Sequence, residues 1–258
     1  DVASQRGYHL LVVFVGGQRP GSVAVEDLFR NRRADGVVAV ASLDKTQLLA
    51  LAELNVPAVC VAQRSPTPSI PNVLFDDRGG ALRAARHLLE QGRRQLIHIR
   101  GPETNYDAVE RCLGFKMALE EAGLKFSKSL EFKGDFQREG GIRAIKEALN
   151  KKVPFDGIFA SNDGMAIGVI ETLNDRGISI PDQVEIVGFD DIESARFVGL
   201  STVRVPLREM GRVAARIVLD QIDGKEAGSE ILSTELVVRA SSTPGHKVSP
   251  IKINHSSH

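Results

Sequence analysis

The segment FDGIFASNDGMAIGVIETLNDRGISIPDQVEIVGFDD (residues 155–191) decides the fold class. Two short apolar runs, GIFAS (157–161) and EIVGFD (185–190), flank a helical pattern over 164–176. A strand, a helix and a second strand in this order are typical of a βαβ unit, in which the two strands pair in parallel. Both apolar runs end in polar residues, so the segment also places candidate binding groups at the carboxyl ends of two strands.

The same alternation continues along the chain in both directions. Strands are predicted where β-branched, apolar runs occur, at 9–15, 36–41, 57–62, 72–76, 95–101, 157–161, 185–190 and 235–240. Helices are predicted between them, at 79–91, 108–122, 138–150, 164–176 and 207–223. Four helices are followed by a glycine that is suited to end them, at Gly92, Gly123, Gly177 and Gly224. The sequence therefore predicts an α/β protein with parallel sheets.

Composition restricts the function classes. The 258 residues are 42% hydrophobic, enough for two ordinary cores, and 33 basic residues balance 33 acidic ones. A zero net charge provides no long-range positive field, so we expect this chain by itself to bind DNA poorly. No apolar run approaches the ~20 residues that cross a bilayer, and no signal-peptide pattern opens the chain. We expect no membrane association and a cytoplasmic location.

Sequence motifs for catalysis, metals and cofactors are absent. The sequence contains no GxSxG, HExxH, paired CxxC, GxxxxGK or kinase motif, and no GxGxxG follows the first predicted strand. The six histidines are scattered, and we expect His87 and His98 to be structural. Cys60 and Cys112 lie in apolar or helical stretches, so we expect buried, inert thiols. The sequence predicts binding without turnover, with no metal and no cofactor.

Polar residues gather where the predicted strands end. These positions are Ser161–Asp163, Asp190–Asp191 and Asp76–Asp77. Each has two possible roles, because Ser, Asn and Asp are also the residues that cap the next helix. As a set, amide and carboxylate groups suit the hydroxyls of a neutral ligand better than they suit a phosphate.

Five motifs in order resemble the LacI/GalR family of transcriptional repressors. They are NVLFDDRGGALRAARHLLEQGRRQLIHIRGP (72–102), ERCLGFKMALEEAG (110–123), the opening segment (155–191), LSTVRVPLREMGRVAARIVLDQI (200–222) and ELVVRAS (235–241). The resemblance implies a fold like that of type I periplasmic binding proteins, an α/β protein whose two Rossmann-like lobes have parallel sheets and are joined by three crossovers, with a ligand cleft between the lobes. It places the crossovers near Gly101, near Pro206 and just after Asp223. The expected N-terminal lobe is then 1–101 plus 207–227, the C-terminal lobe 102–206 plus 228–240, and 241–258 a flexible tail.

The resemblance also implies a function and partners. Family members are homodimers that bind a small effector such as a sugar, polyol or nucleoside, and cleft closure changes the spacing of two DNA-binding heads. This chain opens at DVASQRGYHL, which resembles the last turn of a helix, so we expect that a helix-turn-helix and the first strand of the N-terminal lobe precede it. Binding of operator DNA would then depend on that missing headpiece. The main alternative is a periplasmic sugar-binding protein of an ABC transporter, and a sugar-modifying or nucleoside-modifying enzyme is a third class.

Six residues are expected to contact the effector, three of them by direct match to family positions. Arg111 matches an arginine that reaches into the cleft, where its planar fork suits two ligand oxygens; the alternative is a surface arginine paired with Glu110 or Asp107. Asn162 matches an amide that both donates and accepts, and Asp190 matches a carboxylate that accepts from paired hydroxyls.

The other three expected contacts lie in the loops beside these positions. Phe136 lies where relatives place an aromatic ring that stacks on the ligand, with an ordinary core role as the alternative. Asn105 and Asp107 follow the GP motif and could line the cleft. The chain departs from the family pattern at Asp77 and at Arg93, where relatives have Asn and His, and we expect these changes to affect capping and packing only.

Overall fold

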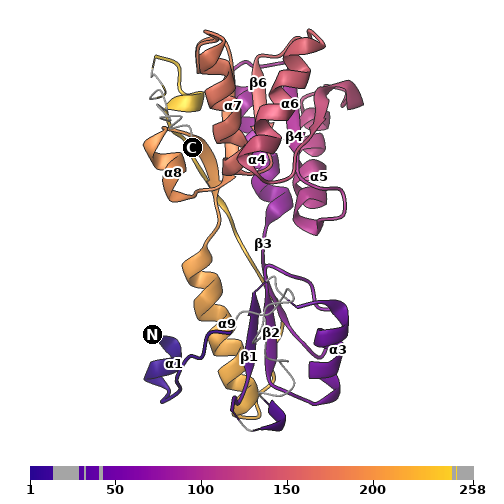
Figure 1. The fold of residues 1–258 in the computed structure, drawn as a ribbon, viewed down its shortest axis with the longest axis vertical. Helices are drawn as coiled ribbons and strands as arrows, with labels where there is room; N and C mark the ends of the chain where they lie inside the picture. The colour runs from indigo at the N-terminus through magenta and orange to yellow at the C-terminus, as the bar shows by residue number, and fades with distance from the viewer. Residues whose placement is uncertain (14–28, 32, 41–42, 246–247, 249–258) are drawn as a thin grey trace, which may run out of the picture. The chain divides into compact units, whose positions relative to one another are not determined.

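The computed structural model describes residues 1–13, 29–31, 33–40, 43–245 and 248. The chain divides into two compact units. Unit 1 contains Asp1–Phe75 and Pro206–Ser233, and unit 2 contains Asp76–Val205 and Thr234–His258. The chain therefore passes between the units three times, as the sequence predicted. Figure 1 shows the elements of each unit.

Unit 2 is built on a six-stranded sheet in the order β10-β8-β7-β6-β4-β5. Its strands are β4 (Leu96–Arg100), β5 (Glu131–Lys133), β6 (Gly157–Ala160), β7 (Glu185–Asp190), β8 (Ser201–Arg204) and β10 (Glu235–Val237). All neighbours pair in parallel except β10, which is antiparallel to β8. The predicted strands at 95–101, 157–161, 185–190 and 235–240 are confirmed within a few residues.

Helices cover both faces of this sheet, as βαβ connections require. One face carries α4 (Asp77–Glu90) and α5 (Tyr106–Glu121), and the other carries α6 (Arg138–Asn150) and α7 (Asp163–Asp175). The remaining short elements are η1 (Lys128–Leu130), α8 (Glu193–Phe197) and η2 (Ala240–Ser242). Alternate residues of β7 serve the two faces: Ile186 joins the core under α6 and α7, whereas Phe189 packs beside Gly80 of α4.

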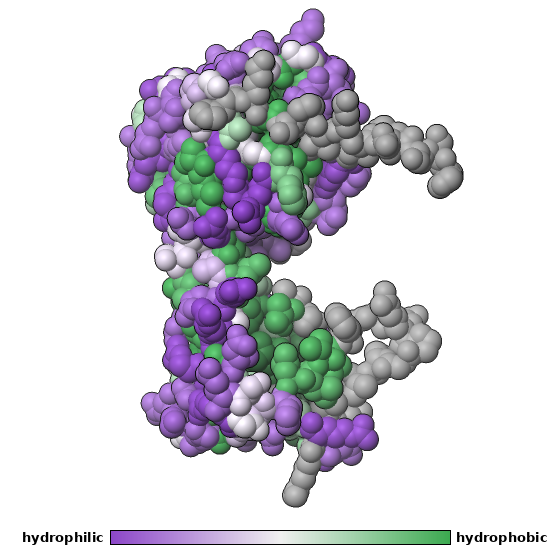
Figure 2. Space-filling view, turned by 90° about the vertical axis from the view of Figure 1, so that its left-hand side faces the viewer, coloured by the Kyte–Doolittle hydropathy of each residue, from purple (hydrophilic) through white to green (hydrophobic). Residues whose placement is uncertain are grey.

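The described residues of unit 1 form a four-stranded parallel sheet in the order β1-β2-β3-β9. Its strands are β1 (Val37–Val40), β2 (Ala58–Val61), β3 (Asn72–Phe75) and β9 (Glu230–Leu232). The helices whose bounds lie within the described residues are α1 (Val2–Gln5), α3 (Lys45–Glu53) and α9 (Leu207–Ile222). Helix α9 packs on β1, β2 and β3. Apolar side chains also lie at the surface of this unit, as Figure 2 shows; Val40 is 58% and Ile231 66% exposed.

Two of the three crossovers differ from the sequence prediction. The first follows Phe75 rather than Gly101, because β4 pairs with β6 in the sheet of unit 2 and α4 packs on α5. The third follows Ser233 rather than residue 227, because β9 pairs with β3 in unit 1. The crossover predicted near Pro206 coincides with the observed division.

Both ends of the chain also differ from prediction where they are described. Residues 9–13 form no strand, and Leu10 is 80% exposed because no described strand pairs with this run. Residues 14–15 of the same prediction lie outside the described residues. The folded part extends past residue 240: Ser241 Oγ donates to Ile186 O at 2.6 Å and accepts from Ser201 N at 2.8 Å. Residues 246–247 and 249–258 of the predicted flexible tail lie outside the described residues.

Candidate functional site

Arg111 is the centre of a buried polar cluster in unit 2. It lies in the second turn of α5 and is 4% exposed. Its Nε donates to Asp77 Oδ1 at 2.7 Å, and its Nη1 donates to Ser161 O at 2.5 Å and to Asp190 Oδ1 at 3.4 Å. One guanidinium therefore links the start of α4 to the carboxyl ends of β6 and β7. The prediction that the strand ends hold the polar site agrees with this arrangement.

Two aromatic rings lie beside the same guanidinium. Arg111 Cζ lies 3.9 Å from the centroid of the Phe189 ring and 5.8 Å from that of Phe136. Both distances fall within the range of cation–π attraction, which is stronger where water is excluded. The alternative of a surface arginine paired with Glu110 or Asp107 is wrong in its exposure, because Arg111 is buried, and Glu110 instead pairs with Arg78 at 2.9 Å.

Asp107 adds a third carboxylate to the surroundings of Arg111. Burial raises the pKa of Asp77 to about 7, and the nearby charge of Asp107 adds to this effect while Arg111 opposes it. Burial likewise raises the pKa of Asp190 to about 6, again with Asp107 adding and Arg111 opposing. We call Arg111, Asp77, Asp107 and Asp190 the Arg111 cluster. Its carboxylates outnumber its guanidinium three to one, a balance that disfavours an anionic ligand.

A second cluster begins one residue further along the chain. Asp191 accepts from Arg204 Nε at 2.7 Å and from Arg239 Nη2 at 2.5 Å. Burial by itself would raise the pKa of Asp191. The hydrogen bonds from Arg239 and Arg204 outweigh this effect, so the pKa lies below its ordinary value. We call these three residues the Asp191 cluster. Asp190 and Asp191 have φ of 115° and 58°, uncommon values for residues other than glycine, and this turn sends neighbouring carboxylates to different clusters.

Asn162 connects α7 to the loop that carries Phe136. Its Oδ1 accepts from Met165 N at 2.9 Å and caps α7, and its Nδ2 donates to Phe136 O at 2.8 Å. The capping role that the sequence left open for Asn162 is therefore present, together with a second contact. Both ends of the amide have protein partners, so a ligand contact by Asn162 would add to these hydrogen bonds or replace one of them.

Phe136 has a backbone that its neighbours hold in an unusual conformation. Its φ is 66°, in the left-handed region, and Asn162 binds its carbonyl. Its ring packs directly on Gly101, where any Cβ would collide with it, so a glycine is required at that position. The half-buried ring also packs against the core under α6 and α7, which agrees with the core role left open above.

Asn105 caps α5 rather than joining the Arg111 cluster directly. Its Oδ1 accepts from Ala108 N at 2.9 Å. The structure thus brings Arg111, Asp190 and Asp107 together and attaches Asn162 to Phe136, whereas Asn105 has a capping contact one and a half turns before Arg111.

Three members of the site were not among the predicted ligand residues. Asp77 accepts from Arg111 Nε at 2.7 Å, Ser161 provides a backbone carbonyl, and the Phe189 ring lies 3.9 Å from Arg111 Cζ. The sequence placed Asp77 and Ser161 at strand ends, which was a usable signal. Phe189 gave none, because an apolar residue inside a strand is expected in the core in any case.

Asp163 is hydrogen-bonded to the loop that follows β7. It is fully buried, its Oδ1 accepts from Thr202 Oγ1 at 2.5 Å and its Oδ2 accepts from Ile192 N at 2.9 Å. Burial raises its pKa to about 7, and these hydrogen bonds oppose that shift. Asp163 therefore fixes the segment that follows Asp190 and Asp191.

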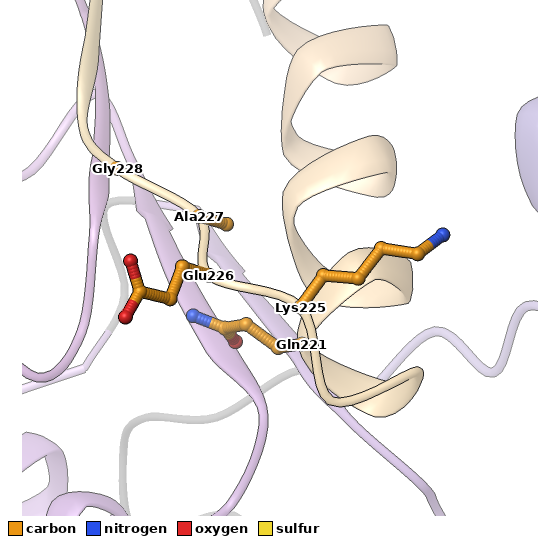
Figure 3. A pocket seen from close by; sticks show the side chains of 5 residues that line it. All are labelled: Gln221, Lys225, Glu226, Ala227 and Gly228. Carbon is orange, nitrogen blue, oxygen red and sulfur yellow. The ribbon is translucent and has the colours of Figure 1, made fainter.

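A surface pocket is also present in unit 1, beside the end of α9 (Figure 3). It is lined by Gln221, Lys225, Glu226, Ala227 and Gly228, and it contains none of the predicted site residues. Gln221 Oε1 already accepts from Ala58 N at 2.7 Å, and Lys225 pairs with Asp223 at 3.3 Å. The pocket therefore gives no reason to move the site from unit 2. Among the described residues, no helix is long and apolar enough to span a bilayer.

Comparisons with known proteins agree with the sequence motifs. Residues 85–242 match the family described as periplasmic binding protein-like domain. The chain is 29% identical over 244 residues to the HTH-type transcriptional repressor CytR of Escherichia coli (strain K12), covering 93% of this chain and 72% of CytR. It is 33% identical over 233 residues to the HTH-type transcriptional regulator GalR of the same strain, covering 88% of this chain and 67% of GalR.

The solved structure of a transcriptional regulator CelR–cellobiose complex superposes with a TM-score of 0.80 at 31% identity, covering 92% of this chain and 75% of that one. The expected fold, like that of type I periplasmic binding proteins, is confirmed by this match and by the parallel sheets. On the family match and these relatives together, the chain belongs to the LacI/GalR family of transcriptional regulators.

Proposed function

We propose that this chain is the effector-sensing core of a transcriptional repressor and that the effector binds at the Arg111 cluster. The observation that carries the proposal is the position of Arg111, which is 4% exposed, oriented by Asp77 and in contact with Asp190 at the carboxyl end of β7. The Asp190 side chain is 33% exposed, so it offers a hydrogen-bond acceptor to a ligand. A prearranged guanidinium and carboxylate lose little entropy when a ligand binds.

The proposed effector is a neutral, hydroxylated molecule such as a sugar, polyol or nucleoside. Three carboxylates around one guanidinium disfavour phosphates, whereas hydroxyls can donate to Asp190 and accept from Arg111. The CelR structure named above contains cellobiose, which supports a sugar in this family at 31% identity. Phe136 would stack on the apolar face of such a ligand, and Asn162, Asn105 and Asp107 would border it.

The remaining parts of the proposal follow from the relatives. Both curated relatives are named HTH-type regulators, which supports operator binding through a helix-turn-helix that precedes this core. We propose a cytoplasmic homodimer without enzymatic activity, whose affinity for DNA the effector changes. The regulatory relatives also disfavour the alternative of a transport protein. Sedimentation of the purified chain tests the dimer, since a monomer at all concentrations contradicts it.

A ligand screen tests the binding proposal. The melting temperature of the wild-type chain is measured with neutral mono- and disaccharides, polyols and nucleosides, and with sugar phosphates as anionic counterparts. A ligand that binds only the folded state raises the melting temperature. We expect at least one neutral compound to do so, and we expect Asp190→Ala to weaken this response while the exposed control Asp182→Ala keeps it in full. Stabilisation by phosphates alone, or an unchanged response in Asp190→Ala, contradicts the proposal.

A further inference from the structure

A histidine with an unused ring nitrogen is buried beside the middle strands of the unit 2 sheet. His98 of β4 is fully buried and packs against the rings of both Phe115 and Phe159, with centroid distances of 5.0 and 5.3 Å. Its Nε2 is hydrogen-bonded to Ser161 Oγ at 2.8 Å, whereas its Nδ1 has no hydrogen-bond partner. A buried polar atom without a partner is costly and calls for a specific explanation.

Two further metal-binding groups lie next to His98. Glu131 is directly opposite His98 in the pairing of β5 with β4. Its Oε1 pairs with Arg100 Nε at 3.1 Å, and its Oε2 accepts from Cys112 Sγ at 3.3 Å. A ring nitrogen of His98, the Cys112 sulfur and a Glu131 carboxylate oxygen all lie within 4.8 Å of one another. Cys112 is half-buried, not buried as the sequence suggested, so this group can be reached from solvent.

We propose that His98, Cys112 and Glu131 bind a divalent cation of the zinc type, a site that the sequence did not predict. Imidazole, thiolate and carboxylate are the three protein ligands that zinc uses, at about 2.0–2.3 Å from the ion. On binding, the Cys112 thiol loses its proton to solvent, and the ion takes the place of that proton between Sγ and Oε2. The bare Nδ1 of His98 provides the third ligand, Ser161 holds the other ring nitrogen, and water fills the fourth position.

The geometry requires a small adjustment and sets a preference among metals. Ligand atoms around a tetrahedral zinc lie roughly 3.6 Å apart, so the group has to contract by about 1 Å. Cys112 and Glu131 are both only partly buried, and their side chains can rotate to do this. The nearby charges of Arg100 and Lys116 oppose any cation, so binding depends on the metal–sulfur bond. We therefore expect Zn²⁺ and Co²⁺ to bind and Mg²⁺ and Ca²⁺ not to bind.

The test is a metal titration of the whole chain with Zn²⁺ by calorimetry and with Co²⁺ by absorption. We expect one ion per chain and, for Co²⁺, a charge-transfer band that reports a bound thiolate. Cys112→Ser and Glu131→Gln should each weaken Zn²⁺ binding by ~100-fold or more, since even partners outside the ligand shell contribute 10–100-fold. Cys112→Ser should also remove the charge-transfer band, while its metal-free melting temperature stays close to wild type.

Two control variants locate the ion. Cys60→Ala removes the other thiol of the chain and should leave Zn²⁺ binding intact. A variant in which His246, His255 and His258 are all alanine should also retain it. If that triple variant loses the ion, or if Cys112→Ser retains it, the metal binds elsewhere and the proposal is overturned. Failure of the wild-type chain to bind stoichiometric Zn²⁺ overturns it as well. Neither result bears on effector binding.

Discussion

The Arg111 cluster and the Asp191 cluster lie at the same end of β7 but have opposite charge ratios. The first has three carboxylates around one guanidinium, and the second has two guanidiniums around one carboxylate. Asp190 is 33% exposed as a side chain and has a raised pKa, whereas Asp191 is 7% exposed and has a lowered one. An incompletely neutralised, partly open cluster is therefore suited to replace a protein partner by a ligand. A fully neutralised cluster is suited to hold the chain in one conformation.

The largest expected effect comes from breaking the Asp191 cluster. Asp191→Ala removes the carboxylate that two arginines share and leaves Arg239, 16% exposed, without that partner. Loss of one member of a largely buried ion pair costs about 3 kcal/mol in unfolding free energy. We expect urea unfolding to show this loss of unfolding free energy. The effector affinity of the folded variant should equal that of wild type. A variant as stable as wild type would contradict the structural role of this cluster.

The next effect comes from opening the Arg111 cluster at its exposed member. Asp190→Ala should reduce effector affinity by about thirty-fold, or about 2 kcal/mol, because it removes a charged hydrogen-bond acceptor. Its unfolding free energy should change less than that of Asp191→Ala, since a third of the Asp190 side chain is already in solvent. Calorimetry with a stabilising compound measures the first quantity and urea unfolding the second. A larger loss of unfolding free energy in Asp190→Ala than in Asp191→Ala would falsify the comparison of the two clusters.

The two clusters should also respond oppositely to pH. Asp77 has a pKa of about 7 against an ordinary 3.8, so between these values the folded chain holds a proton that the unfolded chain releases. Its contribution to stability therefore falls as pH rises from about 4 to about 7, by at most about 1.4 kcal/mol per pH unit. Asp191, whose pKa is lowered, contributes stability that is lost as pH falls below its ordinary range.

Asp77→Asn keeps an oxygen for Arg111 but removes the titration. Urea unfolding across this pH range should therefore show a flatter dependence for Asp77→Asn than for wild type. An identical dependence in both proteins would mean that Asp77 is ionised throughout this range, and the raised pKa assigned to Asp77 would then be wrong.

The smallest effect concerns the ring beside the Arg111 cluster. Phe136→Ala should weaken effector binding by about 1 kcal/mol, the scale of a lost aromatic contact. Phe136→Leu keeps most of the packing on Gly101 and on the core, so it separates loss of stacking from loss of packing. Equal affinity in wild type and both variants would leave Phe136 with a packing role alone.

The sequence predicted elements well where a local pattern repeats. It predicted them less well where the fold depends on pairing between strands that are distant in the sequence. The alternation of apolar strands and amphipathic helices located α4, α5, α6, α7 and α9 to within two residues at either end. The three-residue strands β5 and β9 carry too few residues for a pattern. The first crossover was misplaced because the sequence before Gly101 cannot show that β4 pairs with β6 rather than with β3.

The candidate site followed a similar division. Strand ends and family positions identified Arg111 and Asp190, which the structure joins at 3.4 Å. The partner of Arg111 could not be predicted, because Asp77 is 34 residues away and nearer carboxylates at Glu110 and Asp107 were available. The group of His98, Cys112 and Glu131 could not be predicted for the same reason. The register between β4 and β5 places Glu131 opposite His98, and no spacing in the sequence shows that register.

The tripeptide Ser161–Asp163 has a consequence for how this protein could diversify. Ser161 binds Arg111 and His98, Asn162 binds the Phe136 loop, and Asp163 binds Thr202 and the loop after β7. Inserting or deleting a single residue here would misalign all of these partners at once. New ligand preferences in this lineage should therefore arise by exchange of side chains, while the length of this connection stays constant.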